Sequence, residues 1–587
     1  MKVILAALII AVFICGSCFA AEFSNIAPMK SIKALTGQEP LPDGNAVPYQ
    51  PGAILDSPGI IVGTTYYDYQ TNGSTGNRVA ICSDGSKYFN WMYMSDWPNL
   101  PRHVYHNWMD ADGNLNPNAI DGQVNCDAGA GYTNLDIIYN SRGCFTYHSS
   151  GGTAPTYVTV SVDNQMPGMG LFEHYNPPDE LFPQTQDSPG RCYWPYVCVD
   201  RSDNIHVVMT EYTDRRLSRM AYCNSTDDGT SWGTLQFVDT VMVTSSVIDA
   251  SPVSDRVALA YSRTTDTTTQ WRNDIYYVVS DDGTLWNFRY GRNNITNYAD
   301  DDDSLFAYTD LDIIFDYNDN IHIVWTDQGC SLNYVYFRTN LKHWDEESGE
   351  IEEIMHHPDS LWTIENIEGV FNRPISKMNL GVSGSDSLFC TFTYFDTSDV
   401  SAGGFANGEI YLVYKYNGAW YGPQNLTNSP SNGCIPGECD SDHWSTLADV
   451  VDDSLHILYI NDKDAGGIPQ TEGTPTENPV MYLTCLKPYI PGIDEDDNHP
   501  MNFSLSQNYP NPFNSRTVIN YSLLKPSQVQ LAIYDIFGRH VETLVDESQP
   551  AGCYEAIWNA DGAASGIYYY KIRTGGKSAT KQMVLLK

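Results

Sequence analysis

Three histidines, His206, His322 and His456, occupy the same position in a phrase that recurs along the chain, an acidic turn followed by an aliphatic strand. Imidazole is a common metal ligand and a general base near neutral pH. A shared metal site would require the three rings to converge. A residue that recurs in register with a repeat instead packs at the same place within each unit. We therefore interpret the three histidines as packing residues.

Two turns carry Asp, Gly and Trp at fixed spacing. Ser225 to Trp232 fits the pattern Ser-x-Asp-x-Gly-x-[Thr/Ser]-Trp at every position, and Val279 to Trp286 fits it with two departures. In such a hairpin the Asp accepts backbone N–H bonds, the Gly takes a positive φ and the Trp packs under the turn. The residues expected in these structural roles are Ser225, Asp227, Gly229, Trp232, Asp281, Gly283 and Trp286.

Because of these two turns, the middle of the chain resembles Asp-box β-propellers such as sialidases. The resemblance implies three arginines on a substrate carboxylate, a Tyr–Glu nucleophile pair and an acidic acid/base residue. Arg78, Arg191 and Arg373 each precede an apolar strand and are the candidate catalytic residues. The echo of the family's Phe-Arg-Ile-Pro around Arg373 has the wrong order and lies late in the chain. Arginines at strand entrances also cap carbonyls or pair with acids, so both interpretations stay open.

Other chemistry has little support. No Gly-x-Ser-x-Gly, His-Glu-x-x-His or phosphate loop is present in the sequence. We expect no cofactor, and Ca²⁺ is considered only at Asp110–Asn114 and Asp300–Asp303, which lack a complete ligand spacing. Cys434 and Cys439 flank a Pro-Gly turn that favours a disulfide, whereas Cys192 and Cys198 are expected not to pair if they share one strand.

The elements that hold these residues are strands. Between about residues 58 and 489 the phrase of two apolar strands around a polar turn occurs seven times, spaced by roughly 50 to 70 residues. Third and fourth strands follow several copies. Four antiparallel strands in each radial unit predict an all-β, seven-bladed β-propeller. We expect the strand around Ile60–Tyr66 to close the ring as the fourth strand of the last unit.

The last segment, 503–587, has short alternating strands typical of a small Ig-like β-sandwich. It resembles the type A C-terminal sorting domain of the type IX (Por) secretion system. The resemblance rests on Leu505–Asn514, Ile533–Asp535 with Gly538-Arg539, Ala551-Gly552 with Trp558, and Ser565–Tyr568. It implies export from a Gram-negative-type cell by the Sec route and then across the outer membrane. The partner it implies is the type IX secretion machinery.

The N-terminus has the pattern of a secretory signal, with Lys2, an apolar run and small residues before Ala21. A lipoprotein signal at Cys18 is the alternative. We find no transmembrane segment in the mature chain. The formal net charge is −40, which disfavours nucleic acid and anionic lipid as partners.

These features predict five segments: a signal peptide (1–20), an N-terminal extension (21–57), the propeller (58–489), an acidic linker (490–502) and the sorting domain (503–587). The expected function is an extracellular or cell-surface binding module for a glycan or a protein. The alternative is a sialidase-like glycoside hydrolase. Trp91–Trp97 and the pair Trp420-Tyr421 are candidate sugar-stacking stretches, or they are core.

Overall fold

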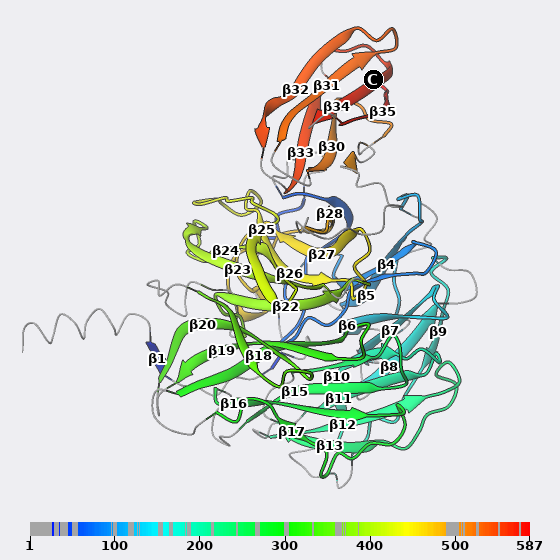
Figure 1. The fold of residues 1–587 in the computed structure, drawn as a ribbon, viewed down its shortest axis with the longest axis vertical. Helices are drawn as coiled ribbons and strands as arrows, with labels where there is room; N and C mark the ends of the chain where they lie inside the picture. Colours follow the sequence, from blue (N-terminus) through cyan, green and yellow to red (C-terminus); the bar gives the residue numbers. More distant parts are fainter. Residues whose placement is uncertain are drawn as a thin grey trace, which may run out of the picture. The chain divides into compact units, whose positions relative to one another are not determined.

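The computed structural model of the chain consists almost entirely of antiparallel strands (Figure 1). In the described residues the helical structure is the 3₁₀ turn η3 (Ile468–Gln470). The structure describes 26–28, 34–35, 41, 45–49, 57–488 and 504–587. Within these the exceptions are 96, 98–101, 116–121, 126, 128, 151–155, 164–167, 182–183, 185–189, 213–216, 242–244, 265–270, 299–303, 331–333, 358–366, 368, 370, 385–386, 506–507, 509–510, 524–526, 550–551, 561 and 575–576. The expected signal peptide, the linker and Asp300–Asp303 lie outside the described residues.

Two compact units make up the chain. The larger contains Met1–Ile54, Val62–Val450 and Leu458–Val480, and the smaller contains Leu55–Ile61, Val451–Ile457 and Met481–Lys587.

Along the middle of the chain, successive strands lie in small antiparallel groups. The first three groups are β3 (Val79–Ile81), β4 (Lys87–Tyr93) and β5 (His103–Met109); β6 (Gly129–Ile138), β7 (Arg142–Ser150), β8 (Tyr157–Asp163) and β9 (Phe172–Tyr175); and β10 (Cys192–Val199), β11 (Ile205–Glu211), β12 (Ser218–Ser225) and β13 (Gln236–Val241). The next two are β14 (Ser246–Ala250), β15 (Val257–Thr264), β16 (Asn273–Ser280) and β17 (Asn293–Asn294); and β18 (Ser304–Phe315), β19 (Ile321–Cys330), β20 (Tyr334–Asp345) and β21 (Ile351–His356). Another group is β22 (Ile375–Val382), β23 (Leu388–Val400), β24 (Ala406–Tyr416) and β25 (Ala419–Asn425).

The repeated phrase of the sequence forms the first two strands of each group. In β10 and β11, for example, Val197 lies opposite Val207, and in β18 and β19 Ile313 lies opposite Ile323. The first strand β10 is buried along most of its length and is nearly continuous in apolar residues. The first strand β22 is buried along its whole length although it includes Ser376, Lys377 and Asn379. One residue pair, Asn273 of β16 with Ala307 of β18, joins two neighbouring groups into one larger sheet. The arrangement is all-β and propeller-like.

The last group has the strand order β2 (Ile60–Thr65), β28 (Asn478–Leu486), β27 (Ser454–Asp462) and β26 (Ser441–Leu447). A strand from near the start of the chain therefore lies beside the last strand of the repeats. The expectation that Ile60–Tyr66 completes the last unit is confirmed. Gly59 suits this approach, because a Cβ at that position would lie 2.5 Å from the Tyr482 carbonyl oxygen.

The C-terminal strands form two further sheets (Figure 1). One has the order β29 (Ser504–Leu505), β30 (Arg516–Leu523) and β33 (Gly552–Asn559), and the other β32 (His540–Gln549), β31 (Ser527–Asp535), β34 (Gly566–Thr574) and β35 (Lys577–Leu585). Their inward residues, among them Ile519, Leu531, Trp558 and Tyr570, form one buried core. Alternation of apolar and polar residues along these strands places one face inward, as a half-buried strand requires.

Candidate ligand-binding site

The first strands of several groups carry a bulge at equivalent positions. The register shifts at Gly131/Asn134 in β6, at Tyr193/Tyr196 in β10, and at Ser376/Asn379 in β22. The residues inside these bulges and the matching residue of β26 have left-handed φ values: Tyr132, Trp194, Lys377 and Trp444. A bulge re-aims a side chain and is common beside binding sites. Here the bulges bring aromatic and cationic side chains to one end of the first strands.

Residues 70–77, which we call the central loop, fill the space between these strands. The Ser74 hydroxyl donates to the Leu311 carbonyl of β18 at 2.7 Å, and the Thr75 hydroxyl donates to Asn379 Oδ1 of β22 at 2.7 Å. The Tyr196 hydroxyl of β10 donates to the Ser74 carbonyl at 2.7 Å. Gly76 abuts Asn134 of β6 so closely that a Cβ would lie 1.6 Å from its Oδ1. The loop thus ties several repeats together at their centre.

A small hollow, with room for about one water molecule, lies beside the central loop. Its walls come from three parts of the chain, namely the central loop with Arg78 and the bulges of β6 and β10. The lining residues are Thr71, Asn72, Arg78, Tyr132, Asn134, Trp194, Pro195 and Tyr196. One cation, several aromatic rings and amide groups therefore face a single small space.

Arg78 is 2% exposed. Its Nη2 donates to the Gln70 carbonyl at 2.8 Å, while its Nε is buried without a hydrogen-bond partner. No carboxylate forms an ion pair with it in the part of the chain that the structure describes. Burial lowers the pKa of Arg78 to about 10, and the nearby Tyr196 and Tyr132 oppose that shift. The site therefore holds an incompletely compensated cation.

Leu35, from the N-terminal extension, lies against this hollow. Its N–H donates to Asn72 Oδ1 at 2.8 Å, and the Asn72 amide donates back to the Leu35 carbonyl at 2.7 Å. Trp194 Nε1 also donates to the Leu35 carbonyl, at 3.0 Å. Further along, Val47 bonds to the backbone at Pro475 and Glu477. Described parts of the extension therefore contact two walls of the hollow.

The other two candidate arginines have partners of their own. Arg191 forms ion pairs with Asp179, at 2.9 Å, and with Glu180. The Arg373 guanidinium lies 3.9 Å from the Tyr308 ring centroid and 4.8 Å from that of Trp271, and its Nε donates to Gln328. Among the described contacts none joins Arg78, Arg191 and Arg373. The sequence analysis did not single out Tyr132, Trp194 or Lys377. The stretch 132–138 (Tyr-Thr-Asn-Leu-Asp-Ile-Ile) does recur almost unchanged at 308–314, which is a signal for the position of Tyr132.

The first Asp-box turn has the expected geometry. Asp227 Oδ1 accepts the Ser231 N–H at 2.7 Å, the Gly229 N–H donates to the Ser225 hydroxyl at 2.9 Å, and Gly229 has φ +86°. Trp232 packs against the neighbouring apolar cluster.

The second turn requires a correction. Asp282, not Asp281, accepts the backbone N–H bonds of Thr284 and Leu285, at 2.9 and 2.7 Å. Ser280, and not Val279, holds the position of the first Ser of the motif, and its hydroxyl bonds to Asp282 Oδ1 as that of Ser225 bonds to Asp227. The spacing from this Ser to the Trp is one residue shorter than in the first turn. Gly283 keeps its positive φ of +65°, and Trp286 packs against Tyr222 with centroids 4.8 Å apart.

The repeated histidines lie within separate groups of strands. His206 contacts the Tyr222 hydroxyl at 2.7 Å and Asp200 at 3.2 Å, and His456 contacts the Tyr482 hydroxyl at 2.6 Å and Asp452 at 3.4 Å. His322 has Asp316 on one side, but His343 replaces the tyrosine on the other. A contact between the histidine and an aspartate of the preceding turn recurs in all three groups, which supports a packing role.

His343, Asp345 and Glu352 are the described residues whose ligand atoms are close enough together to hold a metal ion. Glu352 accepts hydrogen bonds from Lys415 Nζ at 2.6 Å and Trp420 Nε1 at 3.1 Å. The Lys415 ammonium group thus supplies the positive charge beside Glu352 that a metal ion would otherwise supply. The acidic turn at Asp110 is likewise satisfied internally, because the Asn114 N–H donates to Asp110 Oδ1 at 2.7 Å.

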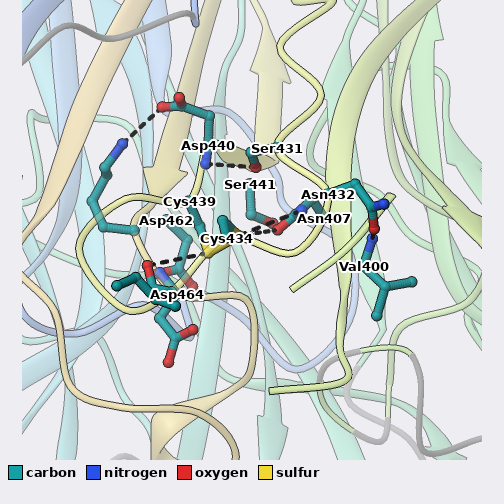
Figure 2. Close-up of a disulfide and its surroundings, with 12 residues drawn as sticks. Val400, Asn407, Ser431, Asn432, Cys434, Cys439, Asp440, Ser441, Asp462 and Asp464 are labelled. Atoms are coloured by element: carbon teal, nitrogen blue, oxygen red, sulfur yellow. Dashed lines mark hydrogen bonds and ion pairs between the residues drawn. A yellow bond between two sulfur atoms is a disulfide. The ribbon is translucent and has the colours of Figure 1, made fainter. Parts of the chain in front are cut away.

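Cys434 and Cys439 form a disulfide with a Cα–Cα distance of 5.0 Å, and Cys192 and Cys198 are free and buried. Figure 2 shows Asp440, Asp462 and Asp464 near the disulfide. Lys463 Nζ lies 2.8 Å from Asp440 Oδ1, and Asn461 donates to the same oxygen at 3.1 Å. Burial raises the pKa of Asp464 to about 6, and its Oδ2 accepts the Thr474 N–H. This acidic cluster therefore has partners from its own chain.

The sugar-stacking candidates divide between core and surface. Trp91 and Trp97 are buried, whereas Tyr421 is 44% exposed. Trp91 and Trp97 are therefore core residues, and Tyr421 is a surface aromatic.

Residues 507–586 match the family described as the secretion system C-terminal sorting domain. The chain thus carries a type IX sorting tail, which implies delivery to the cell surface or the extracellular space. Among curated proteins none matches the sequence. No described helix has the length and apolar character that a membrane-spanning helix needs.

Several solved structures resemble the chain at low identity. The polysaccharide lyase Uly1 is 11% identical with a TM-score of 0.43, and the alignment covers 78% of this chain and 99% of that chain. An α-L-arabinanase of Penicillium chrysogenum is 9% identical with a TM-score of 0.37, covering 60% and 93%. The NanB sialidase of Streptococcus pneumoniae is 8% identical with a TM-score of 0.35, covering 63% and 71%.

Proposed function

We propose that this chain is an exported binding module that recognises an extracellular glycan or protein at the end of the first strands where the bulges gather. The observation that carries the proposal is the hollow between the central loop and the β6 and β10 bulges. Small ligand sites are concave and combine apolar walls with a few convergent polar groups. Tyr132, Trp194 and Arg78 supply such walls and such a polar group.

Binding is favoured over hydrolysis by the state of the candidate catalytic residues. A sialidase-type clamp needs three guanidinium groups directed at one carboxylate. Arg191 is engaged by Asp179 and Glu180, and Arg373 lies on two aromatic rings. Arg78 alone of the three lines the hollow.

The proposed architecture has a ring of seven blades, six formed by successive groups from β3 to β25 and the seventh by β26, β27, β28 and β2. An Ig-like sandwich from residue 503 onward follows an acidic linker, 490–502. A Sec signal peptide, 1–20, would start export, and the extension 21–57 would lead into the ring. These boundaries are supported by the strand order and by the family match at 507–586.

A paired screen tests the proposed function. The full chain would be applied to a glycan array and, separately, to a panel of fluorogenic glycosides. We expect retention of at least one glycan class without turnover of any glycoside. Turnover that is lost in Arg191→Ala or Arg373→Ala would instead establish the glycoside hydrolase alternative.

A further inference from the structure

We infer that the end of the sorting domain formed by the β31–β32 turn, residues 536–539, is the surface that docks on the type IX secretion machinery. The partner that fits this surface is a component of the machinery with an apolar groove. The family match at 507–586 identifies the domain but no surface on it. The inference concerns this domain alone and does not depend on the ligand site proposed above.

The β31–β32 turn is built by polar groups and presents two large apolar side chains to solvent. Asp535 Oδ1 accepts the N–H groups of Phe537 and Arg539, each at 2.9 Å, and Arg539 Nε donates to Asp535 Oδ2 at 2.6 Å. Gly538 has φ +74° with nothing within 4 Å of a Cβ, so the backbone conformation alone favours glycine there. The turn thus fixes Ile536 and Phe537 in place, although they are 60% and 77% exposed.

Further exposed apolar side chains lie at the same end of this sheet. Asp535 at the end of β31 lies opposite Tyr568 of β34, and Gly566 lies opposite Leu585 of β35. This register places Ile567 and Leu586 at the end where the β31–β32 turn lies, and both are exposed, at 39% and 57%. Exposed apolar side chains that gather in one place mark interaction sites on soluble proteins.

Two of the segments that carry the sorting-domain resemblance meet at this end. Ile533–Asp535 with Gly538-Arg539 forms the end of β31 and the turn, and Ser565–Tyr568 leads into β34. The Lys587 N–H donates to Ser565 Oγ at 2.9 Å, so the last residue of the chain is held there too. The polar residues of these segments therefore shape an exposed surface, and docking gives a physical reason for that surface to be apolar.

A second copy of the chain is a poor occupant of this surface. A stable complex buries about 800 Å² on each partner, and four partly exposed side chains offer much less. The net charge of −40 also makes two copies repel each other. A small apolar surface suits transient docking, which a cargo that has to be released requires.

Export of the full chain from a bacterium with a working type IX system tests the inference. Ile536→Ser combined with Phe537→Ser removes two exposed apolar side chains and no buried group. We expect the amount of this double variant outside the cell to fall at least about tenfold, with accumulation in the periplasm, since hot-spot side chains carry most of the energy of an interface. The matched control is Leu285→Ser with Tyr290→Ser, because these propeller side chains are each 77% exposed. The control variant should be exported like the unaltered chain.

Two further measurements separate a docking defect from a folding defect. The purified double variant should keep the melting temperature of the unaltered chain, because both side chains are exposed. Should it misfold, a benzophenone amino acid in place of Phe537 is expected to crosslink, on irradiation of the cells, to a component of the type IX machinery, whereas the same group in place of Tyr290 is not. Normal export of the double variant overturns the inference, as does crosslinking from position 537 only to a second copy or to nothing. Retention of the unaltered chain in the cell would overturn the inference together with the sorting role of the domain.

Discussion

Arg78, Arg191 and Arg373 have the same residue type and the same place before a strand, yet their environments differ. What separates them is the chemistry of distant partners. Arg191 meets Asp179 and Glu180, whereas Arg78 meets the carbonyl of Gln70. Such partners depend on how the repeats close around the central loop. Local sequence therefore identified the three candidates but could not tell which of them lines the hollow.

Buried carboxylates clamp neighbouring units to each other. Asp136 accepts the Val199 N–H at 2.6 Å, Asp249 the Phe315 N–H at 2.7 Å, and Asp312 the Leu380 N–H at 2.7 Å. Each bond joins the first strand of one group to the first strand of the next group, β6 to β10, β14 to β18 and β18 to β22. Burial raises the pKa of Asp312 to about 7 and, together with the nearby carboxylates, raises the pKa of Asp249 to about 8.

These carboxyl groups predict a pH dependence of stability. The folded state keeps a proton on Asp249 that the unfolded chain, with a carboxyl pKa near 4, releases. The contribution of Asp249 to the free energy of unfolding is therefore fully present below pH 4. It is lost as the pH rises to about 8, the pKa of Asp249 in the folded state. Glu409, whose pKa burial also raises to about 8, acts in the same direction. Between pH 8.5 and 7 we expect the free energy of unfolding to rise by about 1 kcal/mol for each such group.

Denaturant unfolding at the two pH values measures this change. Asp249→Asn removes one titrating group and is expected to flatten the dependence. An exposed acid that forms a turn, such as Asp227, offers the matched control, because Asp227→Asn should leave the slope between pH 7 and 8.5 unchanged. If the free energy of unfolding instead falls when the pH is lowered from 8.5 to 7, Asp249 and Glu409 are ionised in the folded state and the prediction is wrong.

At the scale of elements, the strands were the most predictable feature. The two-strand phrase, the third strands and the first Asp-box turn all depend on short-range patterns of period two and on turn residues. For the second Asp-box turn, the predicted capping residue was wrong by one position. Asp281 and Asp282 are adjacent carboxylates, and in the shorter turn Asp282 accepts the backbone N–H bonds. Sequence pattern decided that a hairpin exists there, and backbone length decided which acid caps it.

The central loop could not be predicted. Its residues, Gln-Thr-Asn-Gly-Ser-Thr-Gly-Asn, have the composition of an exposed turn, yet most of them are buried. Gln70 and Thr71 bond to nearby residues, but Ser74 and Thr75 bond to strands that lie more than a hundred residues away. Closure of the repeats around the loop provides these distant partners, and no local sequence pattern encodes them.

Gly76→Ala tests the fit of this loop. Gly76 has φ +58°, and a Cβ would lie 1.6 Å from Asn134 Oδ1. We expect a loss of at least about 2 kcal/mol of folding free energy, the sum of backbone strain and a clash in a packed centre. Gly113→Ala is the matched control, because Gly113 has φ +85° with nothing within 4 Å of a Cβ, and should cost about 1 kcal/mol. Equal costs for the two variants, measured by denaturant unfolding, would contradict the tight packing of the loop.

The contact of Leu35 with Asn72 and Trp194 predicts that the N-terminal extension restricts access to the hollow. A chain that begins at Ser57 loses the backbone groups that bond both side chains. We expect faster iodide quenching of tryptophan fluorescence than in a chain that begins at Ala21, and faster association of any ligand of the array. Identical quenching and association rates in the two chains would exclude this shielding role.

At the scale of the whole molecule, the sorting domain was the easiest part to recognise. Its motifs are contiguous in sequence and depend on no other part of the chain, and residues 507–586 match the family. The hollow has the opposite character, since it combines Arg78 with bulges that begin more than fifty and more than a hundred residues later in the chain. The sorting domain was therefore predictable from sequence, and the proposed binding site was not.

The sorting domain has a buried core of its own, so folding and export should be separable. A chain that ends at Gly492 is expected to keep its melting transition and to remain in the periplasm, whereas the full chain leaves the cell. Differential scanning calorimetry and fractionation of producing cells measure the two effects. A truncated chain that misfolds, or one that still reaches the medium, would refute this division of roles.

The most direct measurement of the central claim is a hydrogen-exchange footprint of the full chain with and without a glycan retained on the array. We expect protection at the central loop, residues 70–77, and at the bulges Tyr132–Asn134 and Trp194–Tyr196, which line the hollow. The surface around Tyr421 and the strands β29 to β35 should exchange equally in both samples. Protection at Tyr421 or within the sorting domain, with unchanged exchange at the central loop and the bulges, would contradict a binding site at the centre of the repeats.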